Sequence, residues 1–537
     1  ENNWLTGRID AGFKALQKGY HALLAVALRH KWLLVVIFIG TAGAAVWLLE
    51  QIPNEYTPKE DRGAFFVLVN GPEGASYEKM SQYMNEAEQR LMPLVEKGEV
   101  TRLLVRAPRA FGNVAIFNTG IMILVLDDWD KRRSAFEIMN EIRTELSDLP
   151  GVKAFPVMRQ GFGKRIQKPL QFVIGGGTYE ELAEWRDILR AKIDEDNPGL
   201  VGLDWDYKET KPQLQVVINY DRAAELGVTV SHIGRTLETM LGSRQVTTYI
   251  EDGQEYDVLL EGERAEQRSP TDIQNIYVRS ERSGELVPLS NVVELVEFAD
   301  SIKLNRYNKV RSITLQANLD EGYSLGEALS YMEGLVKDYL PGEAIIDYKG
   351  QSRDYKFSSE SLVFIFMLGL VVVFLVLAAQ FESWIHPFII MLTVPFAMTG
   401  ALVGLYFTDQ TLNLYSQIGL IMLVGLSAKN GILIVEFANQ LRDMGKDVHE
   451  ALVEAADTRL RPIIMTGITT AAGSVPLIIS SGAGTETRLV IGVVILSGVV
   501  VGTLFTLFIV PAAYDLLGRF SDSPKAMARK LEKELEG

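Results

Sequence analysis

The sequence of 537 residues has no cysteine, only five histidines and fewer basic than acidic residues. Without cysteine there is no disulfide, no thiol nucleophile and no thiolate-bound metal. The histidines show neither an HExxH motif nor a paired spacing, so we expect no metal site and no cofactor. The net charge of −15 argues against nucleic acid as the main partner, because binding phosphates needs clustered Lys and Arg.

Long apolar runs occupy both ends of the sequence, so the mean hydropathy of +0.10 averages two regimes. Residues 32–49 (WLLVVIFIGTAGAAVWLL) carry no charge and are nearly long enough to cross a bilayer. A cleaved signal peptide is the alternative, but the polar and amphipathic stretch before the run is too long for a typical n-region. Five more runs, at 361–381, 384–408, 411–439, 462–485 and 489–514, bring the predicted number of transmembrane helices to six.

Lysines and arginines gather on one side of this predicted topology. The positive-inside rule places their flanks in the cytoplasm. They include Arg29 and Lys31, Arg442 and Lys446, and Arg519 and Lys525. With six crossings both termini are therefore cytoplasmic, and the large insertion after the first helix lies outside the cytoplasm.

The insertion alternates between strand and helix periodicity. Strands predicted at 64–71, 100–107, 120–128 and 152–158, with helices at 77–95 and 134–147, give the β-α-β-β-α-β order of a ferredoxin-like unit. A second such unit begins with a strand at 170–176, a helix at 179–195 and a strand at 202–208, and ends with the corresponding elements at 311–319, 324–339 and 344–350. The residues between its halves, with a hairpin expected at 246–261, form a third subdomain.

The predicted fold class is thus an α-helical membrane bundle of six transmembrane helices plus α+β ferredoxin-like subdomains. The predicted order is a cytoplasmic amphipathic lead-in (1–31), a transmembrane helix (32–50), a first ferredoxin-like subdomain (51–168), a second one (169–211 and 309–357) with an inserted subdomain (212–308), five transmembrane helices (361–514) and a cytoplasmic tail (515–537).

One ionisable residue lies deep in a predicted membrane helix. Lys429 is about 16 Å from the cytoplasmic end of its run at helical rise, where a lysine needs a carboxylate partner. The other runs carry acidic residues only at their ends, and Glu436 is two turns away on the same helix. We therefore expect the partner of Lys429 outside this chain. Protonation of that carboxylate would let the helices repack, which suggests a proton-driven transporter; a structural ion pair with a neighbouring subunit is the alternative.

Hydroxyls and small residues mark two other features of the membrane runs. Thr466, Thr469 and Thr470 follow the start of the fifth run, where bonds to carbonyls of their own helix are the structural interpretation. Small-residue pairs predict close helix packing. These pairs are Gly400 with Gly404 and Gly498 with Gly502.

Two membrane segments carry a family resemblance. GLSAKNGILIVEFANQL (425–441) and TRLRPIIMTGITTAAGSVPLIISSGAG (458–484) resemble the signature helices of the resistance-nodulation-division (RND) transporters, specifically the hydrophobe/amphiphile efflux (AcrB-like) branch. The resemblance covers essentially the whole chain as the C-terminal half of such a pump. Further matching segments are IPNEYTPKEDRGAFFVLVNGPEGAS (52–76), NTGIMILVLDDWDKR (118–132), PQLQVVINYDRAAELGV (212–228) and ESW (382–384).

The resemblance implies a secondary active transporter rather than an enzyme, which exports amphiphilic or hydrophobic compounds such as drugs, detergents and dyes by proton antiport. By position in the motifs, it implies a proton relay of Lys429, Thr466 and Arg459. Helical rise places Thr466 nearer the cytoplasmic surface than Lys429, with Thr470 closer to it in depth, so the threonine assignment depends on the motif.

The resemblance also implies a substrate pocket in the subdomains outside the cytoplasm, which would be the porter subdomains, with 212–308 as the docking subdomain. The implied substrate contacts are Phe66, Phe111, Phe117 and Phe155. The loop 107–117 (APRAFGNVAIF) departs from the glycine-rich loop of the family. Packing in a core is the alternative for each buried Phe.

The implied partners complete a pump in the bacterial inner membrane with a large periplasmic region. They are the N-terminal half, which carries the intramembrane aspartates of the family, two further copies in a trimer, a periplasmic adaptor protein, an outer-membrane channel and the lipid bilayer. The chain is either a piece of a longer polypeptide or one of two split subunits. Alternative functions are a SecD/SecF-like accessory to protein export, metal-ion efflux, for which Met158 is the only suggestive residue, and a non-transporting scaffold.

Overall fold

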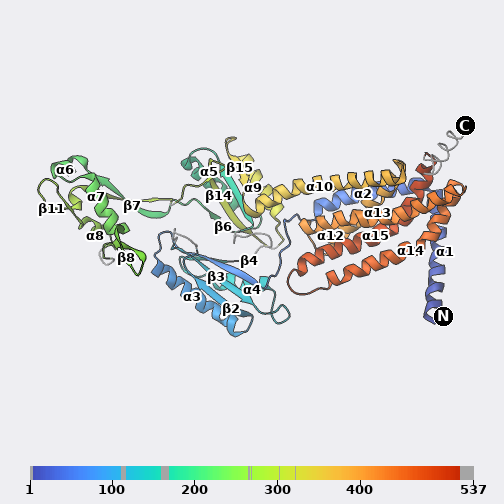
Figure 1. The fold of residues 1–537 in the computed structure, drawn as a ribbon, viewed down its shortest axis with the longest axis horizontal. Coiled ribbons are helices and arrows are strands. Elements are labelled where there is room, and N and C mark those ends of the chain that lie inside the picture. The colour runs from blue at the N-terminus through green and yellow to red at the C-terminus, as the bar shows by residue number, and fades with distance from the viewer. Residues whose placement is uncertain are drawn as a thin grey trace. The chain divides into compact units, whose positions relative to one another are not determined.

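The computed structural model describes residues 4–109, 117–158, 168–263, 267, 269–301, 303–320 and 322–520. The chain divides into two compact units (Figure 1). The larger unit comprises Glu1–Gly71, Ser76–Asp206 and Asn305–Gly537, and the smaller unit comprises Pro72–Ala75 and Tyr207–Leu304. The larger unit contains all the long apolar helices and two α/β sheets.

Five stretches of the described residues are helical, long and apolar enough to cross a membrane: Trp32–Gln51, Phe364–Phe381, Ile385–Phe407, Leu414–Asp443 and Thr485–Phe520. They correspond to α2 (Lys31–Gln51), α10 (Gly350–Phe381), α11 (Ile385–Met391) with α12 (Thr393–Phe407), α13 (Leu414–Asp443) and α15 (Thr485–Leu517), and α1 (Trp4–Arg29) precedes them. The run predicted at 384–408 is divided at Leu392, and the run predicted from 361 belongs to a longer helix.

Helix α14 (Val448–Ile478) packs against α13 and α15 but is not among these five stretches. Its apolar part begins only at Pro462, because Glu454, Arg459 and Arg461 occupy the preceding turns. The prediction of a helix at 462–485 therefore matches the second half of α14, whose helix also extends over the charged residues before it.

Small residues bring α12 and α15 into close contact. A Cβ added to Gly400 would lie 2.5 Å from Cβ of Val501 and 3.0 Å from the main-chain oxygen of Ser497. A Cβ added to Gly502 would lie 2.9 Å from Cβ of Ala397, and one added to Gly498 would collide with Leu423 of α13. The glycine pairs thus pack as the sequence predicted, with no room for a larger side chain.

The first sheet of the larger unit forms from β1 (Ala64–Asn70), β2 (Val100–Arg106), β3 (Thr119–Leu126) and β4 (Lys153–Met158), with α3 (Tyr77–Glu96) after β1 and α4 (Ala135–Glu145) after β3. The strand order is β2-β3-β1-β4, and every pair is antiparallel. Alternate residues of β1 point to opposite faces, so Phe65, Val67 and Val69 are buried with side chains of α3 and α4. Phe66 and Leu68 belong to the other face.

The second sheet brings together strands from distant parts of the sequence. It contains β5 (Leu170–Gly175), β6 (Leu200–Trp205), β13 (Arg306–Tyr307), β14 (Val310–Leu319) and β15 (Ile345–Tyr348), with α5 (Tyr179–Glu195) and α9 (Leu325–Tyr339). Strand β14 pairs with β5, β6 and β13, and β15 pairs with β5. Capping boxes fix the starts of both helices, at Thr178 with Glu181 and at Ser324 with Glu327.

The smaller unit forms between the two halves of that sheet. Its elements are β7 (Lys211–Ile218), α6 (Tyr220–Glu225), α7 (Val230–Leu237), η1 (Glu238–Gly242), β8 (Arg244–Glu251), β9 (Gln254–Leu260), α8 (Pro270–Gln274), β10 (Tyr277–Arg279), β11 (Leu286–Pro288), η3 (Leu289–Asn291) and β12 (Val293–Asp300). Ile233, Leu289 and Val292 are fully buried in its core. The hairpin of β8 and β9 turns at Asp252–Gly253, where both φ angles are positive.

Gly400→Ala is expected to destabilise the bundle by about 1–3 kcal/mol, because the added methyl group overlaps Val501 and main-chain atoms of α15. Gly425→Ala on α13 is the matched control, since a Cβ there meets nothing within 4 Å. The control should be neutral or slightly stabilising, because Ala is the better helix former. Thermal unfolding of both variants in the same detergent checks the difference; equal transitions would contradict the tight seam.

Candidate functional site

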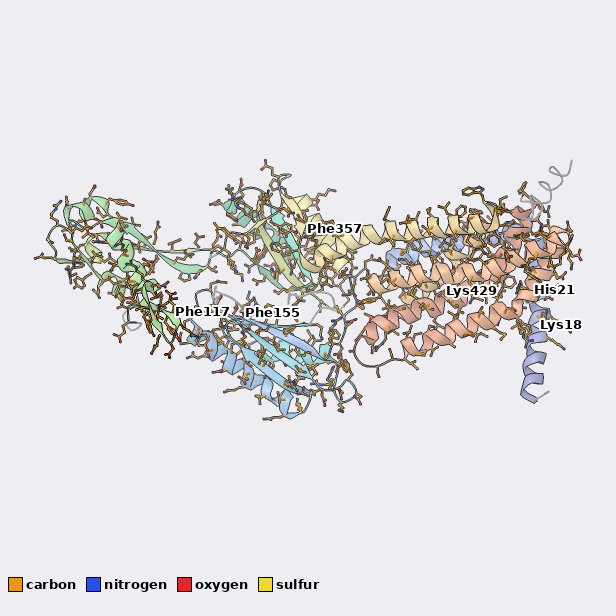
Figure 2. All side chains as sticks on the ribbon, viewed as in Figure 1. Lys18, His21, Phe117, Phe155, Phe357 and Lys429 are labelled. Atoms are coloured by element: carbon orange, nitrogen blue, oxygen red, sulfur yellow. The ribbon has the colours of Figure 1, made fainter. Side chains whose placement is uncertain are left out.

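Lys429 lies near the middle of α13, the location labelled in Figure 2. Its side chain is on the exposed face of the helix together with Met422 and Gly425. Within the described part of the chain, its ammonium group has neither a hydrogen bond nor an ion pair. The location therefore leaves this charge available to a group that the described residues do not supply.

The opposite face of α13 is tightly held within the larger unit. Asn430 is 6% exposed, and its amide nitrogen donates to the hydroxyl of Thr503 on α15 over 3.1 Å. Gly431 lies against Ile390 of α11, where an added Cβ would be 3.3 Å from a methyl carbon. Because the neighbours of Lys429 are anchored, the lysine is presented at a fixed depth. Asn430 is a polar residue of this region that the motif analysis did not single out.

The hydroxyls of α14 bond their own helix. The Oγ1 of Thr466 donates to the carbonyl of Ile463 over 3.1 Å, and the Oγ1 of Thr470 donates to the carbonyl of Thr466 over 2.8 Å. Thr469 donates in the same way to Met465. These are the local bonds of the structural interpretation. Thr466 is half-buried, and none of the bonds found among the described residues joins it to Lys429.

Arg459, near the middle of α14, packs its guanidinium group over the ring of Phe437 on α13, 4.5 Å from the ring centroid. Its Nε is buried and has no acceptor among the described residues. Buried donors normally have a partner. Lys429, Thr466 and Arg459 thus lie on two helices that pack together, and two of the three retain unused donors.

A second polar network, which the sequence analysis missed, lies where α13 and α15 end. Arg442 donates to the hydroxyl of Tyr514 over 3.1 Å, and that hydroxyl donates to Oδ1 of Asn439 over 2.6 Å. The ring of His386 stacks on Tyr514 with centroids 5.7 Å apart, and its two nitrogens are buried without a partner among the residues described. A lone histidine before proline gave no motif, so only the fold could bring it beside Tyr514.

The predicted aromatic contacts divide into three groups. Phe66 and Phe155 are half-buried on one face of the first sheet, in one cluster with Leu68, Ile121 and Val157. Phe117 is 46% exposed, at the start of β3, and is shown with Phe155 in Figure 2. Phe111 lies outside the described residues. The first sheet therefore presents an apolar face that two of the four phenylalanines share.

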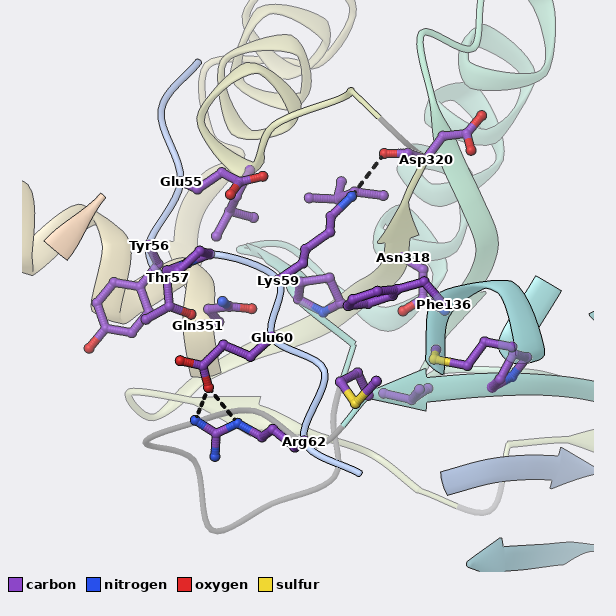
Figure 3. Close-up of a pocket in the computed structure, with 18 of the residues that line it drawn as sticks. Glu55, Tyr56, Thr57, Lys59, Glu60, Arg62, Phe136, Asn318, Asp320 and Gln351 are labelled. Carbon is purple, nitrogen blue, oxygen red and sulfur yellow. Dashed lines mark hydrogen bonds and ion pairs between the residues drawn. The ribbon is translucent and has the colours of Figure 1, made fainter. Parts of the chain in front are cut away.

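A pocket of about 600 Å³ opens at the membrane-proximal end of the two sheets (Figure 3). Its walls come from residues 55–62, from α4, from the ends of β4 and β14, and from the starts of α10 and α13. Apolar side chains such as Met139, Val157 and Leu319 line it together with a few charged ones. Its volume is in the range of pockets that hold small molecules. The sequence analysis did not predict it, because its lining residues are dispersed over the chain.

Residues 52–62, which we call the strap, connect α2 to β1 and form one wall of this pocket. Pro53 and Tyr56 accept hydrogen bonds from the main chain of Leu412 and Leu414, over 2.9 and 3.1 Å. Asn54 accepts one from Gly326 at the start of α9. The main-chain nitrogen of Asp61 donates to a carboxylate oxygen of Glu486 on α15 over 3.1 Å. The strap thus joins the membrane-length helices to both sheets.

Asp61 fixes the end of the strap to the first sheet. Both carboxylate oxygens accept from the guanidinium group of Arg132, each over 2.8 Å, and Arg132 is only 1% exposed. Burial alone would raise the pKa of Asp61, but hydrogen bonds from Arg132, Ala135 and Gly63 outweigh it and hold this pKa below its usual range. The pair is therefore ionised at neutral pH.

Apolar helices long enough to cross a membrane, a mixed α/β insertion and a lysine midway along α13 together define a membrane transporter. Residues 1–518 match the model of the AcrB/AcrD/AcrF family, and the chain belongs to this family of RND transporters.

Relatives agree with this assignment. The chain is 31% identical to an uncharacterised transporter of Haemophilus influenzae, over 95% of this chain and 50% of that protein. It is 31% identical to the multidrug/solvent efflux pump membrane transporter MepB of Pseudomonas putida, over 94% of this chain and 48% of MepB. It is 30% identical to the multidrug export protein AcrF of Escherichia coli, over 91% and 48%. The chain spans about half the length of these relatives.

Asp61→Asn is expected to lower the free energy of unfolding by about 3 kcal/mol, because it leaves the buried charge of Arg132 without a counter-ion. The pKa of Asp61 is lower in the folded than in the unfolded chain. Its stabilisation is therefore present above pH about 4 and is lost as the pH falls through the folded pKa.

Denaturant unfolding followed by tryptophan fluorescence measures this effect at neutral and acidic pH. Asp148→Asn is the matched control, because Asp148 is 74% exposed and pairs with Arg90 at the surface. The control should change the free energy by less than about 1 kcal/mol. If both variants lost the same stability, the buried pair would have no special role.

Proposed function

We propose that this chain is the C-terminal half of a proton-motive-force-driven RND pump that exports amphiphilic or hydrophobic compounds by proton antiport. The observation that carries the proposal is Lys429, a cation at mid-helix depth without a counter-ion among the described residues. The names of MepB and AcrF, an efflux pump and an export protein, support it. An unpaired lysine in hydrocarbon has no value for packing, whereas a carboxylate partner that gains and loses a proton gives it one.

The proton relay consists of Lys429 with Thr466 and Arg459 on the neighbouring helix. In the unprotonated state, a carboxylate of the missing half pairs with Lys429. Protonation of the carboxylate ends that attraction, and α13 and α14 then repack. The local hydrogen bond of Thr466 is exchanged for one to the relay in this model, and the unused Nε of Arg459 provides a further donor.

The missing carboxylate comes from the N-terminal half of the transporter, which docks on the exposed face of Lys429. Met422 is 49% exposed on the same face of α13, and Met465 and Ile468 are 60% and 65% exposed on α14. An apolar partner helix would bury these side chains while presenting its carboxylate to the lysine. Antiport by the complete protein, like this partner, belongs to the proposal.

The membrane arrangement is six crossings, with α14 as the sixth in addition to the five stretches that meet the apolar criterion. Both termini are cytoplasmic, and the α/β part lies in the periplasm of a bacterial inner membrane. The strand order β2-β3-β1-β4 supports a ferredoxin-like classification of the first porter subdomain, and the pairing of β14 with β5 and β6 supports the same classification of the second. The smaller unit is the docking subdomain.

The assembled pump is a trimer that works with a periplasmic adaptor protein and an outer-membrane channel. Substrates contact the apolar face of the first sheet. Phe66 and Phe155 supply its aromatic surface, and Phe117 at the edge of the described chain extends it; Phe111 completes the set from the sequence alone. Apolar faces with few directional contacts accept many amphiphiles, which suits a multidrug transporter.

Lys429→Met is expected to abolish proton-gradient-dependent efflux, because the coupling carboxylate then has no cation to release. Cells express the variant with the N-terminal half, and efflux of a fluorescent amphiphile is measured at equal membrane abundance. Met422→Leu, on the same exposed helix face, is the matched control and should retain parental efflux.

Efflux that survives in Lys429→Met would make the lysine a structural ion-pair partner and refute the relay. A parent protein that exports no amphiphile at all would refute the multidrug assignment and favour the protein-export or metal-efflux alternative. Collapse of efflux in both the lysine variant and its control would show that the face serves docking and not coupling.

A further inference from the structure

Lys59 is the charged residue of the pocket that has no countercharge. Its side chain extends along the pocket in Figure 3, and Nζ reaches only the main-chain oxygen of Asp320, at 3.4 Å. Within the described residues, it has no ion pair with a carboxylate. A main-chain carbonyl neutralises no charge, so the ammonium group retains its capacity to bind an anion.

The acidic residues at the pocket are occupied in other ways. Glu60 binds the guanidinium group of Arg62 through two hydrogen bonds, as the dashed lines of Figure 3 show. The carboxylate of Glu55 accepts from the hydroxyl of Thr411 over 3.3 Å. Burial raises the pKa of Glu55, against the opposing influence of Lys59, which weakens it as a counter-ion. Asp320 directs its carboxylate away from Lys59 (Figure 3).

The remaining surface of the pocket offers apolar contact and a second cation. Phe136 lies beside Lys59 in Figure 3, and Met139, Met158 and Leu319 also line the cavity. Arg143 lines it as well, and its guanidinium group donates to the side chain of Asn140 over 3.0 Å. Flexible methionines adapt to acyl chains of different shape. The cavity therefore combines an apolar floor with cations that carboxylates do not neutralise.

We propose that this pocket binds single-chain amphiphiles with an anionic head group, such as carboxylates or sulfates, and that Lys59 selects them over cationic amphiphiles of the same length. The head group pairs with Lys59 and the chain lies on the Met139 side of the pocket. The occupant is an exported compound and not a resident lipid, because a cavity of about 600 Å³ suits one chain better than a two-chain phospholipid. Its role as substrate rests on the proposed efflux function, whereas its charge preference does not.

Binding is measured on the whole chain in nanodiscs of phosphatidylcholine, with empty nanodiscs as the blank. The probes are dansyl-labelled undecanoate and its trimethylammonium counterpart with the same chain. The parent protein should bind the anionic probe saturably and more tightly than the cationic one. Lys59→Gln should weaken the anionic probe about tenfold, the loss expected from one charge-assisted contact, and leave the cationic probe unchanged. Lys59→Glu should reverse the preference.

Lys337→Gln is the matched control, because Lys337 is exposed on α9 and does not line the pocket. It removes the same charge and should bind both probes as the parent does. Thermal unfolding of each variant establishes that the fold is retained. Equal losses in Lys59→Gln and Lys337→Gln would attribute the preference to net charge and overturn the site.

Two further arms separate the proposal from its neighbours. Phosphatidylglycerol added to the nanodiscs should not displace the anionic probe; displacement that depends on Lys59 would assign the pocket to a lipid and overturn the proposal. Lys429→Met should bind both probes normally, so a failure of proton coupling leaves the pocket assignment intact. Probes that bind equally well, with no effect of Lys59→Gln, would refute it outright.

Discussion

An ammonium group in the middle of an apolar helix is the constraint on which the membrane part of this chain depends. Desolvating such a charge is costly, and the cost falls only when an opposite charge comes close. The chain responds by fixing everything around Lys429 except its counter-ion: Asn430 bonds α15, Gly431 lies against α11, and glycines hold α12 to α15. A rigid setting with one missing charge suits an element whose state is decided from outside.

The same logic of engaged and unengaged charges distinguishes the two ends of the strap. At Asp61 the ion pair is buried, two-pronged and complete, so this end has one stable arrangement. At Lys59, two residues earlier, the cation faces an open cavity and only a main-chain oxygen. Structural charges are satisfied within the chain, whereas the charges assigned to function are those the chain leaves unsatisfied. That contrast, more than the residue types, separates the two roles.

Periodicity predicted most of the elements, because amphipathic strands and helices bury one face and write that face into the sequence. The helix at 179–195 and the strands at 64–70 and 310–319 match their predicted positions to within a residue or so. The start of α14 was missed because its first turns are charged, and the break at Leu392 leaves no mark in a uniformly apolar run. Lys429 was found because a lone lysine in an apolar run is conspicuous. The pocket and the pairing of His386 with Tyr514 were not, because each joins residues far apart in the chain.

The smaller unit enters and leaves through one two-stranded ribbon. Lys211 at the start of β7 pairs with Asp300 at the end of β12, so the two crossing points of the chain are adjacent strand neighbours. A segment whose ends already touch can be shortened, lengthened or exchanged without altering the loop closure of the host. The host sheet, in turn, obtains β6 and β14 from opposite sides of that ribbon and pairs them directly. The inserted unit is therefore modular, and its surface is free to diversify while the sheet that carries it stays the same.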